Sequence, residues 1–331
     1  MTARTTPIAR REFLEWVTLG AAALALPGCR TAARRAGGER TTMFVSLPPW
    51  AVARNVGWPE QARLAARVGY EGIDWAFAAA KAAGVTATRA LLAELGILPT
   101  IVNLPMNGTL GPDDAAFDAQ LAGLAENAAF CAAIGCSRFQ LVLGPTTLPG
   151  QSKEARWDQL RRRFARIGET IAPHGMRLGL EFLGPLYFRT RQPANATAPT
   201  VPFVWTLRET LALAHASGPN VGVTLDAWHW HHSGGTVADI RAADASRIVH
   251  VHVSDARAMP PEEVRDDMRL LPGEGVIDLV GFFGALQALG YRGGVAPETI
   301  GPRIPDTMSP EESAHIALEA TTAVMRKAGV A

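Results

Sequence analysis

Residues 221–229 read Val-Gly-Val-Thr-Leu-Asp-Ala-Trp-His, a mostly apolar run that closes on an aspartate. Similar short runs recur along the chain, and longer stretches with helical spacing of apolar residues lie between them. This alternation is typical of repeated strand-helix units, whose parallel strands are covered on both faces and so read as continuous apolar runs. We count eight predicted strands, at residues 43–47, 72–75, 98–103, 139–143, 177–182, 221–226, 248–253 and 294–297.

The segments between the strands predict helices whose boundaries are marked by proline at the start and glycine at the end. The predicted helices cover residues 59–68, 88–95, 114–134, 153–172, 205–216, 278–289 and 310–327. Eight strands with intervening helices favour a single-domain (β/α)8 TIM barrel over residues 43–331. The G-x-G-x-x-G fingerprint of an open dinucleotide-binding sheet does not follow the first strand. The proline-rich segment 184–202 predicts a loop over the mouth of the barrel.

The N-terminus predicts export from the cytoplasm. Arg10 and Arg11 precede the apolar run 17–26, an order that resembles a twin-arginine signal, and this run is too short for a resident membrane helix. We therefore expect a signal peptide at 1–29, a linker at 30–42, and a periplasmic location. Cys29 follows Leu-Pro-Gly and resembles a lipoprotein processing site, so a lipid anchor at the cell envelope is the alternative.

The composition argues against a nucleic-acid partner. Lys plus Arg (32) nearly cancels Asp plus Glu (31), which leaves a formal net charge of +1 and no broad positive field for phosphate backbones. Two of the three cysteines, Cys131 and Cys136, are expected as buried small hydrophobes rather than as a disulfide framework. This charge favours a neutral small molecule as the substrate. The sequence is also compatible with a homo-oligomer.

Ionisable residues at the ends of four predicted strands are the candidate metal ligands. Glu181, Asp226, His252 and Glu298 each stand at or near the carboxyl end of a strand, which is where active sites of these barrels lie. Three carboxylates and one imidazole suit one divalent ion, with Mn²⁺ ranked first and Mg²⁺, Co²⁺, Zn²⁺ and Fe²⁺ as alternatives. For any one of these carboxylates, a salt bridge would be the commoner role. Four together at one end of an apolar barrel favour a cation.

The second half of the chain resembles the xylose isomerase-like barrel family of sugar phosphate isomerases and epimerases, and the match extends more weakly back to Met43. The motifs that carry this resemblance are Leu225-Asp226-Ala227-Trp228-His229, His250-Val251-His252, the segment 271–278 (Leu-Pro-Gly-Glu-Gly-Val-Ile-Asp) and Gly290-Tyr291-Arg292-Gly293. The resemblance implies Glu181, Asp226, His252 and Glu298 as ligands of one metal. It also implies His229 and Arg257 as substrate contacts.

In such a family the metal stabilises an enediolate form of the sugar while paired carboxylates move a proton. The resemblance thus implies Glu181 and Glu298 as the catalytic acid and base of a sugar or cyclitol isomerase or epimerase. The same residues would also serve a lyase or dehydratase of a keto-sugar, keto-glycoside or inosose. An exported sugar-binding protein without turnover is the alternative from another class. A three-metal endonuclease is disfavoured because the early strands lack the additional histidines.

Other residues near the strand ends carry two interpretations each. Trp75 and Trp228 are candidates for stacking on a sugar, although large aromatic residues more often fill core. His250 lies two residues before His252 and so shares its face of the strand. It is either a partner behind a metal ligand or a plain core residue.

Overall fold

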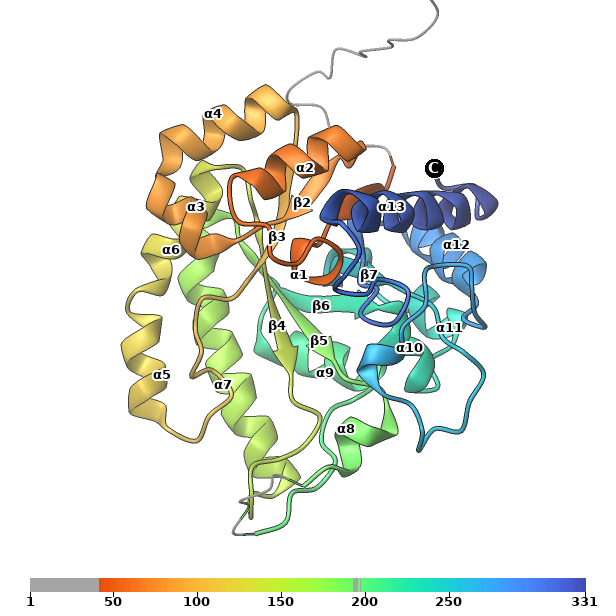
Figure 1. Cartoon of the computed structure of the whole chain (residues 1–331). Helices are drawn as coiled ribbons and strands as arrows, with labels where there is room; N and C mark the ends of the chain where they lie inside the picture. The colour runs from red at the N-terminus through yellow and green to blue at the C-terminus, as the bar shows by residue number, and fades with distance from the viewer. Residues whose placement is uncertain (1–41, 193–195, 197) are drawn as a thin grey trace, which may run out of the picture. The chain divides into compact units, whose positions relative to one another are not determined.

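The computed structural model describes residues 42–192, 196 and 198–331. The predicted signal peptide, Cys29 and the linker up to residue 41 lie outside these residues. Eight parallel strands close into one barrel in sequence order, which confirms the (β/α)8 prediction (Figure 1). The strands are β1 (Phe44–Leu47), β2 (Gly72–Asp74), β3 (Leu98–Asn103), β4 (Arg138–Leu143), β5 (Arg177–Phe182), β6 (Val221–Asp226), β7 (Ile248–Val253) and β8 (Gly294–Pro297).

Helices pack around the outside of this barrel. The longer ones are α2 (Glu60–Val68), α4 (Val85–Leu95), α5 (Asp114–Leu121), α6 (Leu124–Ala133), α7 (Lys153–Ile171), α9 (Leu207–Ser217), α12 (Leu279–Leu289) and α13 (Pro310–Lys327). The shorter ones are α1 (Pro49–Val52), α3 (Phe77–Ala83), α8 (Leu186–Thr190), α10 (Ala227–His232) and α11 (Val237–Arg241), with 3₁₀ turns at Ala172–His174, Ala245–Arg247 and Asp266–Met268. In the described part of the chain, no helix combines the length and apolar character needed to cross a membrane.

Two predicted segments differ in detail from the structure. The stretch 114–134 forms two helices because the chain breaks at Gly123, which caps the start of α6. The segment 184–202 is not wholly a loop, since it contains α8 at residues 186–190. Glycine ends several helices as predicted, with left-handed backbone at Gly69, Gly96, Gly175 and Gly290. Cys131 and Cys136 are both buried and free, as expected.

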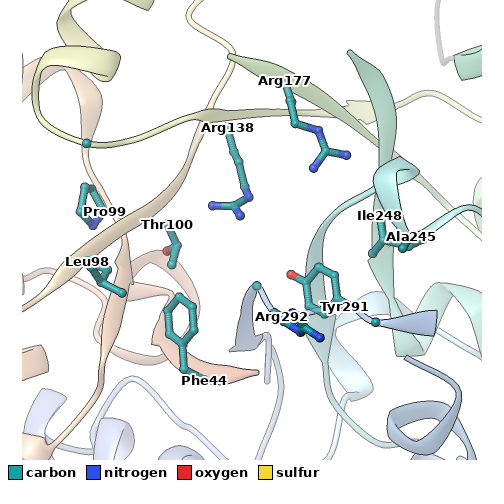
Figure 2. A pocket seen from close by; sticks show the side chains of 13 residues that line it. Phe44, Leu98, Pro99, Thr100, Arg138, Arg177, Ala245, Ile248, Tyr291 and Arg292 are labelled. Carbon is teal, nitrogen blue, oxygen red and sulfur yellow. The ribbon is translucent and has the colours of Figure 1, made fainter. Parts of the chain in front are cut away.

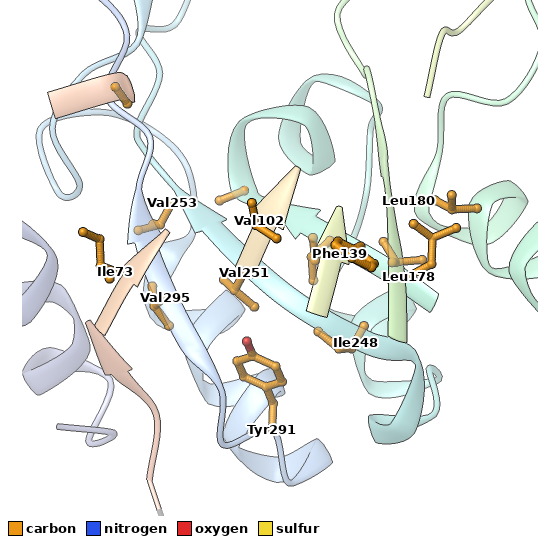
Figure 3. Packing of buried hydrophobic residues seen from close by; sticks show 14 of the residues in the cluster. Ile73, Val102, Phe139, Leu178, Leu180, Ile248, Val251, Val253, Tyr291 and Val295 are labelled. Carbon is orange, nitrogen blue, oxygen red and sulfur yellow. The ribbon is translucent and has the colours of Figure 1, made fainter. Parts of the chain in front are cut away.

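The strand residues alternate between two environments. Leu178, Leu180, Val251 and Val253 belong to the buried apolar cluster, part of which Figure 3 shows around the strands. The residues between them in sequence point into the barrel, because successive side chains of a strand face opposite ways. The lining of the barrel is therefore arranged in layers from the amino to the carboxyl ends of the strands. On β5 these layers are represented by Arg177, Gly179 and Glu181.

Candidate metal centre

The four predicted ligands converge at the carboxyl ends of β5 to β8. One ligand atom each from Glu181, Asp226, His252 and Glu298 lies within 4.8 Å of the others. All four residues are buried, with exposed fractions of 6% or less. Carboxylates this far out of water are costly unless cations or hydrogen-bond donors compensate them. The local charges therefore decide what this cluster can do.

His252 faces two carboxylates with the same nitrogen. Its Nδ1 lies 2.8 Å from Glu181 Oε1 and 2.8 Å from Glu298 Oε2. Burial alone would lower the pKa of His252, but the charges of Glu181 and Glu298 outweigh burial and raise it well above its usual value. A single N–H at Nδ1 hydrogen-bonds to Glu181, and Glu298 Oε2 accepts no hydrogen bond from the described residues. The cluster thus holds more acceptors than donors.

Asp226 is held in place by the start of α10. Its Oδ1 accepts a hydrogen bond of 2.8 Å from the backbone N–H of Trp228, which makes Asp226 the cap of this short helix. The same turn brings His229, one helical turn later, to 3.6 Å from Asp226 Oδ2. The Asp-x-x-His spacing seen in the sequence therefore reflects one helical turn that puts both side chains on the same side.

Arg269 is a site residue that the sequence analysis did not identify. Its guanidinium is buried and lies 2.6 Å from Asp226 Oδ2, 3.5 Å from Glu298 Oε2 and 3.3 Å from His229 Nε2. Asp266 supports it from behind at 2.8 Å. Burial opposes the charge of this guanidinium, yet Asp226 and Glu298 outweigh burial and raise its pKa well above the usual value. Arg269 is the cation that partly balances the cluster.

Arg257, the arginine implied by the family resemblance, is placed differently. It is exposed, and no hydrogen bond or ion pair among the described residues joins it to the cluster. The chain turns at Asp255, whose carboxylate accepts hydrogen bonds from the N–H groups of Gly273 and Ile277, while its backbone pairs with Leu270. This turn folds Arg269 back over the barrel and leaves Arg257 outside. The sequence signal that could have identified Arg269 is its position just before the Pro-Gly-Glu-Gly motif.

A second layer lies beneath His252. Asp74, which the sequence analysis also missed, accepts hydrogen bonds of 2.7 Å from Ser46 Oγ and 2.6 Å from Thr100 Oγ1. Its Oδ2 lies 3.1 Å from His250 Nε2 and 3.8 Å from His252 Nε2. Burial would raise the pKa of Asp74, but the two histidines hold it well below the usual value. A carboxylate behind a ligating imidazole is the usual means of orienting it, so His250 and Asp74 lie where such partners belong.

The aromatic residues near the site differ in their exposure. Trp228 is fully buried, with its ring 4.4 Å from that of His232 and under the Arg269 guanidinium, and Trp75 is buried against Phe130. Neither ring presents a face to solvent, and their role in stacking stays a prediction. Trp50, by contrast, is 39% exposed and lies 5.8 Å from the His252 ring. Phe188 from α8 lies 6.2 Å from the ring of His229.

The donor set fits a divalent cation. Burial is the largest influence on the pKa of Glu298 and raises it. Arg269 and His252 lower this pKa and the charge of Glu181 raises it, so that it stands at about 8. Burial would also raise the pKa of Asp226, but Arg269 holds it down at about 2. A divalent ion would compensate Glu298 and use the oxygen that accepts no hydrogen bond. Three carboxylates and one imidazole at this spacing suit hard or borderline divalent metals.

Fold and site together define a (β/α)8 barrel with a buried cluster suited to metal at the carboxyl ends of its strands. The chain belongs to the xylose isomerase-like TIM barrel family, whose model matches residues 62–323.

Three known proteins show how this chain relates to others. An inosose isomerase from Halalkalibacterium halodurans is 29% identical over 165 residues, which cover 50% of this chain and 53% of that protein, so the match spans about half the length of the relative. A xylose isomerase domain protein from Alicyclobacillus acidocaldarius is 30% identical with a TM-score of 0.76, over 87% of this chain and 99% of that one. The IolI protein, solved with a zinc atom, has a TM-score of 0.72 at 20% identity over 86% and 99% of the two chains, which shows a shared fold.

Proposed function

We propose that this protein is a metal-dependent isomerase or epimerase of a sugar or cyclitol. The observation that carries the proposal is the meeting of Glu181 and Glu298, from separate strands, at one imidazole nitrogen inside a buried cluster. Family membership and the inosose isomerase relative support a carbohydrate or cyclitol substrate. One divalent ion held by Glu181, Asp226, His252 and Glu298 would supply Lewis-acid stabilisation of the negative charge that develops beside a substrate carbonyl.

The protein's own groups would carry the proton. Either Glu181 or Glu298 removes the proton from the carbon next to the carbonyl, and the other returns one to the same or the neighbouring carbon. Two carboxylates from different strands can approach the substrate from different sides, which is what inversion at one carbon requires. Arg269 and His229, which both contact Asp226, are the groups that we expect to bind substrate oxygens. Burial of the cluster excludes bulk water and strengthens these electrostatic contacts.

The metal most suited to this proposal is Mn²⁺, with Mg²⁺, Co²⁺, Zn²⁺ or Fe²⁺ as alternatives. Oxygen-rich donor sets favour the harder ions, while a single imidazole admits zinc and iron. The zinc atom in the IolI structure supports the alternative of zinc. Elemental analysis of the purified protein should find about one divalent ion per chain, and reconstitution of the chelated protein with each ion in turn would rank them by activity.

Exchange of substrate hydrogen with solvent tests the reaction itself. Incubation with a panel of ketoses and inososes in deuterated water should place deuterium at the carbon next to the carbonyl, as observed by NMR. Glu298→Gln should reduce this exchange by roughly a hundredfold or more, because it removes one of the two groups that move the proton. Arg89→Gln, a change at an exposed arginine of α4, serves as the matched control and should retain exchange.

The outcomes separate the alternative functions. Deuterium in a substrate or its isomer supports the proposal. Exchange accompanied by an unsaturated or shortened product would replace it with a lyase or dehydratase. Binding of a sugar without exchange, in protein that contains its metal, would leave a binding protein on the same fold.

We also propose that the protein acts outside the cytoplasm, on the basis of the twin-arginine pattern at Arg10 and Arg11 and the apolar run 17–26. Cell fractionation of the full chain, compared with an Arg10→Lys/Arg11→Lys variant, tests this location. Mass spectrometry of the mature N-terminus decides between cleavage and a lipid on Cys29.

A further inference from the structure

A cavity of about 390 Å³ lies at the opposite end of the barrel from the metal cluster. Its wall includes the first residues of several strands, among them Phe44, Leu98, Arg138, Arg177 and Ile248. These positions are the amino ends of the strands, whereas the metal cluster lies at their carboxyl ends. Figure 2 shows the side chains of this wall around an open centre. The volume falls in the range of small-ligand pockets, which begins at about 300 Å³.

Three arginines contribute to this cavity. Arg138 and Arg177 are partners in the register of β4 and β5, so two positive side chains start adjacent strands side by side. Arg292 comes from the loop before β8 and is exposed. In Figure 2 the guanidinium of Arg138 reaches toward the centre of the cavity, across from Tyr291. No aspartate or glutamate is among the described residues that line the cavity.

The guanidinium groups are poorly neutralised by the protein. Nε of Arg138 is buried without a hydrogen-bond partner, and no ion pair with a described residue involves Arg138, Arg177 or Arg292. Arg177 donates to the backbone carbonyl of Ser246, a neutral acceptor. Burial, and then the nearby charge of Arg138, lower the pKa of Arg177, although Tyr291 and Asp244 oppose this shift. Arginine stays charged in proteins, so this positive charge needs an anion rather than loss of a proton.

We propose that this cavity is a binding site for a phosphoryl group, either free phosphate or a small phosphate ester. The three arginines that line the cavity come from β4, β5 and the segment before β8, and Arg138 reaches toward its centre (Figure 2). A tetrahedral dianion offers acceptor oxygens in several directions, whereas a planar carboxylate offers them in one plane. Forked N–H groups of arginine match phosphate oxygens in pairs, which makes arginine the usual residue for such recognition.

The site is separate from the proposed reaction. A layer of hydrogen-bonded residues, Ser46, Asp74 and Thr100, lies between the cavity and the metal cluster, and Thr100 lines the cavity on one side while it donates to Asp74 on the other. A ligand at the amino ends of the strands would therefore not meet Glu181 or Glu298. The binding measurement below does not depend on turnover, so its failure and a failure of the proposed enzyme activity are distinguishable.

Titration calorimetry of the metal-loaded full chain with inorganic phosphate tests the site, at constant ionic strength set by chloride. We expect saturable binding of one phosphate per chain. Arg138→Gln and Arg177→Gln should each weaken it by roughly tenfold or more, because each removes a charge-assisted hydrogen bond. Arg292→Gln, an exposed change that should not disturb folding, should weaken it by a smaller factor. Arg89→Gln, an exposed arginine of α4, is the matched control and should bind as the wild type does.

The outcomes are as follows. Phosphate binding that is undiminished in both Arg138→Gln and Arg177→Gln would overturn the proposal, because the anion would then bind elsewhere, for example at the bound metal. Absence of saturable phosphate binding in the wild type would also overturn it. If those two variants do not fold, undiminished binding in Arg292→Gln would overturn it as well. Titration with phenyl phosphate and malonate separates the sources: an ester that binds more tightly than inorganic phosphate supports an organic phosphate, and equal binding supports free phosphate. Tighter binding of malonate would replace the phosphoryl group with a carboxylate.

Discussion

The two ends of this barrel differ in how their arginines are neutralised. At the carboxyl ends of the strands, Arg269 lies within 3.5 Å of carboxylate oxygens of Asp226, Asp266 and Glu298. At the amino ends, Arg138 and Arg177 stand side by side, and no described acidic residue lines the cavity. We therefore expect Arg269 to stabilise the folded protein, and Arg138 and Arg177 to serve a ligand instead. The same buried apolar cluster surrounds the strands that form both ends.

The largest effect is expected from Arg269. Arg269→Met should destabilise the metal-free protein by about 3–5 kcal/mol, because it leaves the carboxylate of Asp226 buried without its partner. A divalent ion should recover part of this loss. Urea unfolding with and without metal measures both quantities, and Arg257→Gln should change stability by less than about 0.5 kcal/mol as an exposed control. Equal effects of the two substitutions would break the contrast between the buried and the exposed arginine.

The pH dependence of the metal-free protein should be unusual in sign. The folded-state pKa of Glu298 is raised from 4.5 to about 8, and that of His252 is raised well above 6.5. Both groups hold protons more tightly in the folded state than in the unfolded chain. Their contribution to stability is fully present below the unfolded pKa and is lost as the pH rises through the folded pKa. Metal-free protein should therefore be less stable near pH 8 than near pH 6, by up to about 1.4 kcal/mol per pH unit for each group.

Metal should reverse this trend, since it competes with protons for the same atoms and binds better as the pH rises. Thermal unfolding over this pH range, in chelator and in excess Mn²⁺, provides the comparison. Glu298→Gln should flatten the slope in chelator by removing one titrating group. An identical slope in Glu298→Gln and wild type would show that Glu298 does not retain its proton in the folded protein.

A moderate effect is expected from Asp74. Asp74→Asn keeps the size of the side chain but removes the charge that faces His250 and His252. Metal affinity should fall by about 10–100-fold, as is typical when a carboxylate behind a ligating histidine is lost. Competition with a chelator of known affinity measures this change. Asp244→Asn, an exposed aspartate, is the control, and an unchanged affinity in Asp74→Asn would exclude a positioning role.

The smallest effect is expected at the amino ends of the strands. Arg138→Gln should change the stability of anion-free protein by less than about 1 kcal/mol, because it removes one of two adjacent like charges and breaks no ion pair among the described residues. Urea unfolding in chloride buffer measures this change beside that of Arg269→Met. A loss as large as that of Arg269→Met would mean that Arg138 holds the barrel together, and the contrast between the two ends would fail.

Much of the fold could be predicted because the barrel repeats one local unit, an apolar strand followed by a helix. Strand boundaries agree with the structure to within about a residue, since buried parallel strands must be apolar and glycine must end many of the helices. The break at Gly123 and the helix at 186–190 were harder to predict. Each depends on how a short segment packs on the finished barrel rather than on its own pattern.

The convergence of Glu181, Asp226, His252 and Glu298 was also predictable from the sequence, because the carboxyl ends of parallel strands in a closed barrel must meet. Their chemical neighbours were not. Arg269 lies 43 positions after Asp226, and the turn at Asp255 brings it to the site. Asp74 lies 107 positions before Glu181, and closure of the barrel brings it there. Residue types and strand periodicity thus determine which groups face the barrel axis. Tertiary structure decides which charges lie close enough to perturb one another, because electrostatic energy depends on distance and burial rather than on position in the chain.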